Sequence, residues 1–81
     1  MTTEGNVRWA IDHLKTEAHA TAKDKGFWDA PRREFPETIA LIHSELSEAL
    51  EAYRRDDVPG MEEELADALI RIFDAAEAYE L

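Results

Sequence analysis

Apolar residues recur every three or four positions along three stretches of the chain, a spacing that predicts three amphipathic helices. The first is expected from about Asn6 to Asp24, with Asn6 as a candidate N-cap and Gly26 as a candidate stop. Its apolar positions are Val7, Ile11, Leu14 and Ala18. These four residues would form the buried stripe of the first helix.

The second helix is expected to begin near Pro36, whose fixed φ suits a first helical turn, and to run to about Arg55. One continuous apolar stripe follows the helical spacing and is predicted to face the core: Ile39, Ile42, Leu46, Leu50 and Tyr53.

A short turn is predicted over residues 56–60, followed by a third helix whose first turn holds Glu62, Glu63 and Glu64. The stripe predicted to face the core is Met61, Leu65, Leu69, Ile72, Ala76 and Tyr79. Ile70 and Phe73 add apolar surface outside it, so this helix needs a further partner. The pattern predicts an all-α fold, a small bundle of three main helices in one domain spanning residues 1–81. Because so short a chain has little interior, oligomerisation is expected to complete the bundle.

The segment from Lys25 to Phe35 is an aromatic-rich connector between the first two helices. In one interpretation Lys25, Phe27 and Trp28 form the lip of a nucleotide site, where Trp28 stacks on a base and Lys25 meets a phosphate. In the other, Phe27 and Trp28 plug the end of a small bundle. The residues alone leave both interpretations open.

Charge is distributed unevenly along the chain. The net charge of −10 arises in the second part, because residues 1–35 carry six acids and six bases, whereas residues 36–81 carry thirteen acids and three arginines. Such a surface disfavours duplex nucleic acid and anionic membranes as partners, although a nucleotide bound with Mg²⁺ remains compatible with it. Cysteine is absent, and no basic leader or bilayer-length apolar run occurs, so a cytoplasmic protein is expected.

Two acidic couplets, separated by fifteen residues, are the strongest candidate for chemistry. Glu45 and Glu48 stand three apart on the second helix, and Glu64 and Asp67 stand three apart on the third, so each pair shares a helix face. Four carboxylates from two helices suit a hard cation such as Mg²⁺. The alternative is that these are ordinary acids on solvated faces. The apolar neighbours Leu41 and Ala52 favour a half-buried site.

Arg71 and Asp74 follow on the same predicted face as the second couplet. Arg71 would contact a phosphate or position an acid, or it would form a surface ion pair with Asp67. Asp74 would be either a further ligand or a second partner of Arg71. A di-iron site is disfavoured, because His13, His19 and His43 do not stand at the required offset from an acid.

Three strings of the sequence together resemble the MazG-like nucleotide pyrophosphohydrolases, an all-α superfamily. They are the Lys-Gly-Phe-Trp-Asp run of residues 25–29, the first couplet with its surroundings over residues 41–54, and the second couplet with its surroundings over residues 63–74. The resemblance implies Mg²⁺-dependent hydrolysis of a (d)NTP to the (d)NMP and pyrophosphate, in the control of nucleotide pools, by a homo-dimer or homo-tetramer. Mn²⁺ is expected to substitute for Mg²⁺. The metal ligands and catalytic residues it implies are Glu45, Glu48, Glu64 and Asp67.

The chain departs from that family at its end. Many relatives continue into a further helix whose Lys, Asn and Arg residues face the triphosphate, and this chain is expected to lack it. It is then a shortened member or a truncated one, or Lys25, Arg54, Arg71 and a neighbouring subunit supply those contacts. The alternative function is a non-catalytic acidic module that binds another protein and retains a metal site.

Overall fold

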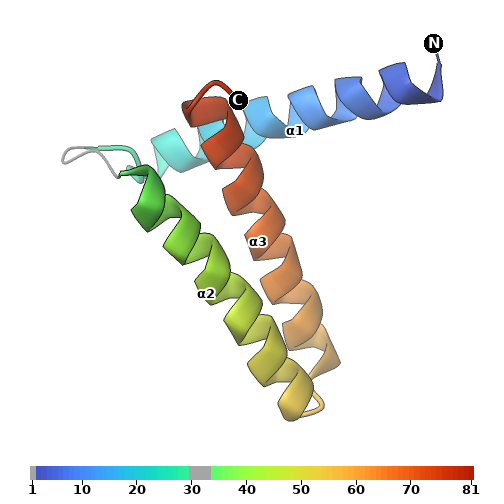
Figure 1. The fold of residues 1–81 in the computed structure, drawn as a ribbon, viewed down its shortest axis with the longest axis vertical. Helices are drawn as coiled ribbons and strands as arrows, with labels where there is room; N and C mark the ends of the chain where they lie inside the picture. The colour runs from blue at the N-terminus through green and yellow to red at the C-terminus, as the bar shows by residue number, and fades with distance from the viewer. Residues whose placement is uncertain (1, 30–33) are drawn as a thin grey trace. The chain divides into compact units, whose positions relative to one another are not determined.

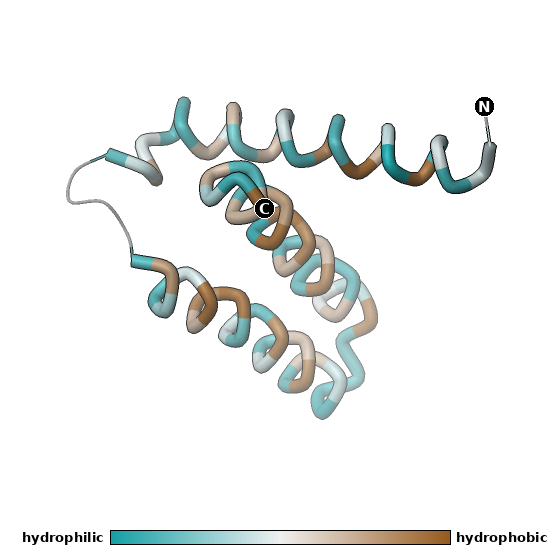
Figure 2. Tube along the Cα trace, turned by 45° about the horizontal axis from the view of Figure 1, so that its top comes forward, coloured by the Kyte–Doolittle hydropathy of each residue, from teal (hydrophilic) through white to brown (hydrophobic). Residues whose placement is uncertain are grey.

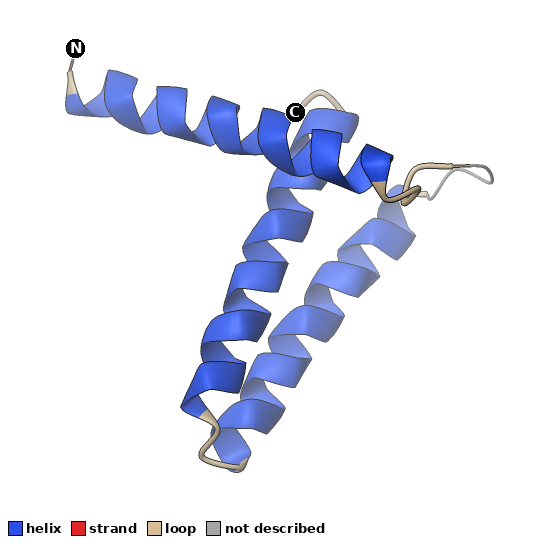
Figure 3. Ribbon diagram, turned by 180° about the vertical axis from the view of Figure 1, so that it is seen from behind, coloured by secondary structure: helices blue, strands red, loops and turns tan. Residues whose placement is uncertain are grey.

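A computed structural model describes residues 2–29 and 34–81 of the protein. Within these ranges all regular secondary structure is helical (Figure 3): α1 spans Thr3–Asp24, α2 spans Phe35–Arg54 and α3 spans Val58–Ala78. The prediction of an all-α chain with three helices is confirmed. Part of the predicted connector, residues 30–33, lies outside the described residues. No described helix has the length and apolar character that crossing a bilayer requires.

Helix α1 begins earlier than its apolar spacing predicts. Thr2 is the N-cap, and its hydroxyl accepts a hydrogen bond from the Gly5 backbone N–H at 3.0 Å, so the prediction that Asn6 caps the helix is wrong. The predicted stop is confirmed. Gly26 lies just after the helix with φ of 79°, and the next N–H, that of Phe27, donates to the Ala22 carbonyl at 3.0 Å.

The turn between α2 and α3 is shorter than predicted. Because α3 already begins at Val58, Pro59 and Gly60 belong to its first turn, where proline's fixed φ is compatible with a helix. The Asp57 carboxylate accepts a hydrogen bond from the Gly60 N–H at 3.0 Å and so satisfies one free donor of this helix start. Asp56 takes the left-handed conformation, with φ of 55°.

The chain divides into two compact units that are best described separately. The first, here called the α1 unit, comprises residues 1–32 and 73–81, so α1 is joined in it by the end of α3. The second, here called the hairpin unit, comprises residues 33–72. In it α2 and the greater part of α3 run antiparallel and side by side (Figure 1).

In the hairpin unit, small and polar residues occupy the most buried positions. Ala52 and Ala68 are almost fully buried, and Thr38, Ile42 and Glu45 are buried too. The predicted core stripes are wrong for most of their large members: Ile42 is buried and Ile39 and Met61 are half-buried, but six others are 43–63% exposed, namely Leu46, Leu50, Tyr53, Leu65, Leu69 and Ile72. Figure 2 shows these hydrophobic segments recurring along both helices. The two helices thus pack through their small and polar residues, and their leucines face outward.

In the α1 unit, too, small residues are buried and large apolar residues are exposed. Ala22 and Ala75 are buried, whereas three residues of the stripe predicted for the first helix, Val7, Ile11 and Leu14, are exposed. The last residue is held in this unit, since the Lys15 ammonium donates a hydrogen bond to the Leu81 carbonyl at 2.8 Å.

Candidate metal centre

Three carboxylates of the hairpin unit converge from its two helices. Glu45 and Glu48 come from α2 and Glu64 comes from α3, and one oxygen of each lies within 4.8 Å of the others. Glu45 is buried, Glu64 is half-buried and Glu48 is exposed, so the group spans the distance from the helix contact to solvent. Spacing of three residues on α2 and antiparallel packing against α3 produce this convergence.

Arg71 supports the most buried of the three acids. Its Nε donates a hydrogen bond to Glu45 Oε1 at 2.9 Å, from a guanidinium side chain that is 34% exposed. Of the two interpretations drawn from the sequence, the pairing with Asp67 is wrong, because Glu45 is the described acid with which Arg71 pairs. Arg71 therefore positions a member of the cluster.

The closeness of the three carboxylates shifts the pKa values of Glu64 and Glu45 in opposite directions. Glu64 Oε2 is shielded from solvent and has no hydrogen-bond partner among the described residues. When Glu64 is protonated, it can donate to the carboxylates of Glu45 and Glu48, and this hydrogen bonding, followed by burial and the repulsion of their charges, raises the pKa of Glu64 to about 7. Burial alone would raise the pKa of Glu45, but hydrogen bonds with Glu64 and Arg71 and the Arg71 charge outweigh it, so the pKa of Glu45 is lowered.

The donor set fits a hard divalent cation. Three carboxylates supply oxygen ligands alone, as Mg²⁺ and Ca²⁺ prefer, and a cation would remove both the repulsion and the unpartnered state of Glu64 Oε2. Asp67, the fourth acid of the predicted set, is half-buried and lies outside the group of mutually close oxygens. The structure thus brings together three of the four acids.

A cavity of about 350 Å³ in the hairpin unit reaches two of these acids. Glu48 and Glu64 line it together with Glu51, Arg55, Asp57 and Glu63. The cluster is consequently open to solvent and to a small ligand on this side, and the opening is strongly acidic. An anionic ligand would need a cation to enter it.

The second group of interest lies in the α1 unit and centres on Asp74. This carboxylate is buried and accepts hydrogen bonds from Trp28 Nε1, at 2.9 and 3.0 Å to its two oxygens. His19 Nδ1 lies 2.8 Å from Asp74 Oδ1, and because an ionised carboxylate only accepts, Nδ1 is the nitrogen that carries the proton. Neither role predicted for Asp74, a further metal ligand or a partner of Arg71, is seen.

Trp28 is half-buried, and its ring meets those of His19 and Tyr79 edge-to-face at centroid distances of 5.7 and 5.9 Å. It lines a cavity of about 300 Å³ with His19, Lys23 and Ala78, whereas Lys25 is exposed and is not among these lining residues. The sequence interpretation missed His19. Its partner Asp74 stands 55 residues away, and no local spacing predicts such a pair.

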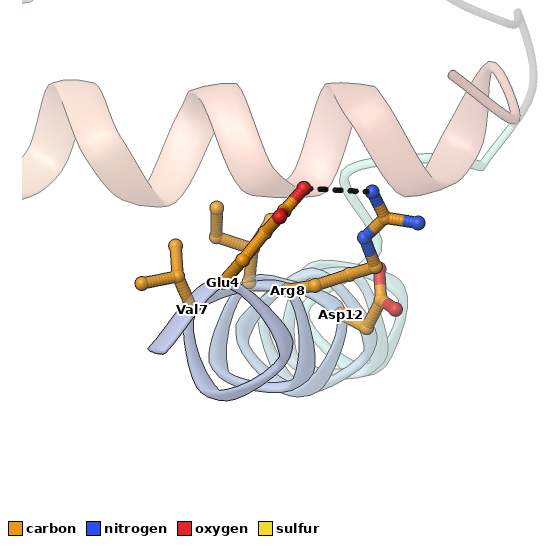
Figure 4. Close-up of a pocket in the computed structure, with 5 residues that line it drawn as sticks. Glu4, Val7, Arg8 and Asp12 are labelled. Atoms are coloured by element: carbon orange, nitrogen blue, oxygen red, sulfur yellow. Dashed lines mark ion pairs between the residues drawn. The ribbon is translucent and has the colours of Figure 1, made fainter. Parts of the chain in front are cut away.

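A third hollow lies along α1 and carries no convergent chemistry (Figure 4). Glu4, Val7, Arg8, Ile11 and Asp12 line it, and Arg8 Nη2 lies 3.9 Å from Glu4 Oε1. Both side chains are exposed, so this ion pair contributes little to stability.

Comparisons with family models, with curated proteins and with solved structures find no match to this chain.

Proposed function

We propose that the Glu45, Glu48 and Glu64 cluster binds a divalent cation, Mg²⁺ with Mn²⁺ as a substitute. The observation that carries this proposal is the shielded Glu64 oxygen, which has no partner and faces two further acids. Buried polar groups normally have partners, and a cation supplies one for all three acids together. Asp67, which follows Glu64 by three residues on α3, is proposed as the fourth ligand.

We propose further that the protein hydrolyses a (d)NTP to the (d)NMP and pyrophosphate, on the basis of the resemblance to the MazG-like enzymes together with this cluster. Bound Mg²⁺ would neutralise phosphate oxygens and acidify a water molecule. The water oxygen bonds to the α-phosphorus, the bond from that phosphorus to the bridging oxygen breaks, and pyrophosphate leaves. A carboxylate of the cluster accepts the water proton, while Arg71 holds Glu45 in place.

Each unit, taken by itself, holds residues that are proposed to contact the substrate. Arg71 is in the hairpin unit, and Lys25 and Trp28 are in the α1 unit, where Asp74 fixes the Trp28 indole through two hydrogen bonds. Asp74 is accordingly proposed as a positioning residue for Trp28. The functional form is proposed to be a homo-dimer or homo-tetramer that acts in nucleotide-pool control.

The test is a panel of canonical and modified (d)NTPs incubated with Mg²⁺ and analysed by product chromatography. The monophosphate and pyrophosphate are expected, and oxygen from ¹⁸O-labelled water should appear in the monophosphate. Glu64→Gln should lower turnover by about a hundredfold or more, the scale of losing a principal electrostatic group, with helical content unchanged. Glu62→Gln, the same chemical change at an exposed acid two residues earlier, is the matched control.

Release of the diphosphate and phosphate would contradict attack at the α-phosphorus. If this chain is inert but a version extended by a further helix is active, the site needs that helix. If both are inert across the panel, the non-catalytic acidic module replaces the enzyme.

A further inference from the structure

The cavity beside Trp28 in the α1 unit, here called the tryptophan cavity, has no carboxylate among the described residues that line it. These residues are His19, Lys23, Trp28 and Ala78, and the volume is about 300 Å³. The other two cavities described above are both lined by acids, in a chain whose net charge is −10. The tryptophan cavity therefore differs from them in charge, and it is large enough for a small ring compound.

Two basic side chains line the tryptophan cavity together. His19 and Lys23 stand four residues apart on α1, so they are neighbours on one face of that helix. Lys23 forms no ion pair with any residue that the structure describes. When His19 is protonated, two like charges at this spacing destabilise each other. An anion bound by both side chains removes that repulsion.

Asp74 fixes the orientation of the His19 ring. Its Oδ1 lies 2.8 Å from His19 Nδ1, and the side chains of His19 and Asp74 are only 20% and 11% exposed. Because Nδ1 is occupied by this contact, Nε2 is the nitrogen that remains for a ligand, and in the protonated ring it is a hydrogen-bond donor. Protonated His19, Lys23 and Asp74 together carry one net positive charge, which an anionic ligand balances.

Trp28 supplies an aromatic wall that is held in place. Its Nε1 donates to the two oxygens of Asp74, at 2.9 and 3.0 Å, and its ring meets that of Tyr79 edge-to-face. The indole N–H is thus already used, and the ring offers a ligand apolar and aromatic contact. Ala78 adds apolar surface from the end of α3, which lies beside α1 (Figures 1 and 3). An aromatic ring is the ligand body that fits such a wall.

We propose that the tryptophan cavity binds a small aromatic oxyanion. The ring of the ligand packs on Trp28 and Ala78. Its carboxylate or phosphate group accepts hydrogen bonds from His19 Nε2–H and from the Lys23 ammonium, and hydrogen bonds between charged groups are the strong ones. The site lies within the α1 unit and needs no metal ion, so this inference does not rest on the proposed enzymatic function.

The charge of the ligand separates this proposal from simple aromatic stacking. An uncharged ring of the same shape would gain the contact with Trp28 but leave the charge of Lys23 unbalanced. A cationic ring would be attracted by the indole face, yet it would be repelled by Lys23 and by protonated His19. The comparison that decides the question is therefore between an oxyanion and its neutral isostere.

The experiment titrates benzoate and phenyl phosphate into the protein at pH 6, where an imidazole of ordinary pKa is largely protonated, with EDTA present to remove metal ions. A Trp9→Phe background leaves Trp28 as the single tryptophan, and its fluorescence reports binding. Saturable binding of either oxyanion supports the proposal, and the tighter of the two identifies the preferred charged group. Benzamide, which has the shape of benzoate without its charge, should bind at least about tenfold more weakly.

Two variants of α1 test whether the charge acts at the cavity. Lys23→Gln removes a charge that lines the tryptophan cavity, and Arg8→Gln removes the same charge from an exposed position that lines a different one. Lys23→Gln should weaken oxyanion binding at least about tenfold and leave benzamide binding unchanged. Arg8→Gln should change neither. Absence of saturable binding, equal affinity for benzoate and benzamide, or equal effects of the two variants overturns the proposal.

Nuclear magnetic resonance locates the ligand without any variant. The chain has three histidines, and His13 and His43 are exposed residues that do not line the tryptophan cavity. Addition of the oxyanion should shift the imidazole signals of His19 and leave those of the other two in place. Unchanged His19 signals at a saturating concentration overturn the proposal, whether or not the carboxylate cluster binds a metal.

Discussion

Glu45 in the hairpin unit and Asp74 in the α1 unit are buried to the same degree, each 8% exposed, yet their surroundings are opposite. Asp74 accepts hydrogen bonds from the indole of Trp28 and the imidazole of His19. Glu45 receives one from Arg71, but it also faces two further carboxylates. Burial alone therefore does not identify a functional acid. A carboxylate surrounded by donors holds the fold together, whereas the repulsion between carboxylates crowded against each other is relieved by a proton or by a cation.

The largest expected effect on stability comes from removing the well-partnered acid. Asp74→Ala leaves the Trp28 N–H and the His19 N–H without their acceptor in a buried site, and should lower the free energy of unfolding by about 3 kcal/mol. Urea denaturation of the metal-free protein measures this change. Glu64→Gln, which removes a crowded acid, should cause no loss of stability above pH 7. A loss equal to that of Asp74→Ala would abolish the contrast between the two acids.

A smaller effect is expected from metal. If the cluster holds Mg²⁺ as proposed, binding to the folded state and not to the unfolded chain should stabilise the protein by about 2.7 kcal/mol at a hundredfold excess over the dissociation constant. A rise in melting temperature measures this stabilisation. The double variant Glu48→Gln with Asp67→Asn should lose the response, and Asp74→Asn should keep it if it folds. Melting of the parent protein that is unaffected by millimolar Mg²⁺ or Mn²⁺ would remove the metal site.

A third expected effect is a pH dependence of the metal-free protein. The pKa of Glu64 is raised from 4.5 to about 7 on folding, so the folded state binds more protons than the unfolded state between these values. Its stabilising contribution is complete below pH 4.5 and is lost as the pH rises through 7. The difference in unfolding free energy between the parent protein and Glu64→Gln should fall across this interval, because the variant lacks the titrating group. Excess Mg²⁺ should flatten the curve, and a difference that grows with pH would contradict the shift.

The sequence predicted the helices well but not the faces that they bury. Periodic spacing and glycine at a helix end are local properties, so the three helices and the stop at Gly26 could be predicted. The large apolar stripes were assigned to the core because the pattern of one helix does not tell whether its partner is the same chain or another. Ala52 and Ala68 are the most buried residues of the hairpin unit instead.

Some residues of the candidate site could be predicted from the sequence and others could not. Glu45, Glu48 and Glu64 could be predicted, because spacing on two adjacent helices is enough to bring them together. The position of Asp67 outside the cluster depends on small rotations of α3 that spacing does not specify. The pair of His19 and Asp74 depends on the packing of segments far apart in the chain, which local sequence does not encode.

The turn between α2 and α3 is so short that it limits which insertions and deletions can be tolerated during evolution. Only residues 55–57 separate the two helices, and Asp57 is tied to the first turn of α3 by its bond to the Gly60 N–H. Because these residues are not helical, an in-frame insertion or deletion of one codon there would change how the chain reverses direction and would shift α3 relative to α2. Glu64 would then no longer lie close to Glu45 and Glu48. The length of the turn therefore determines the position of α3 relative to α2. Descendants of this gene should vary in the residues of the turn far more readily than in the length of the turn.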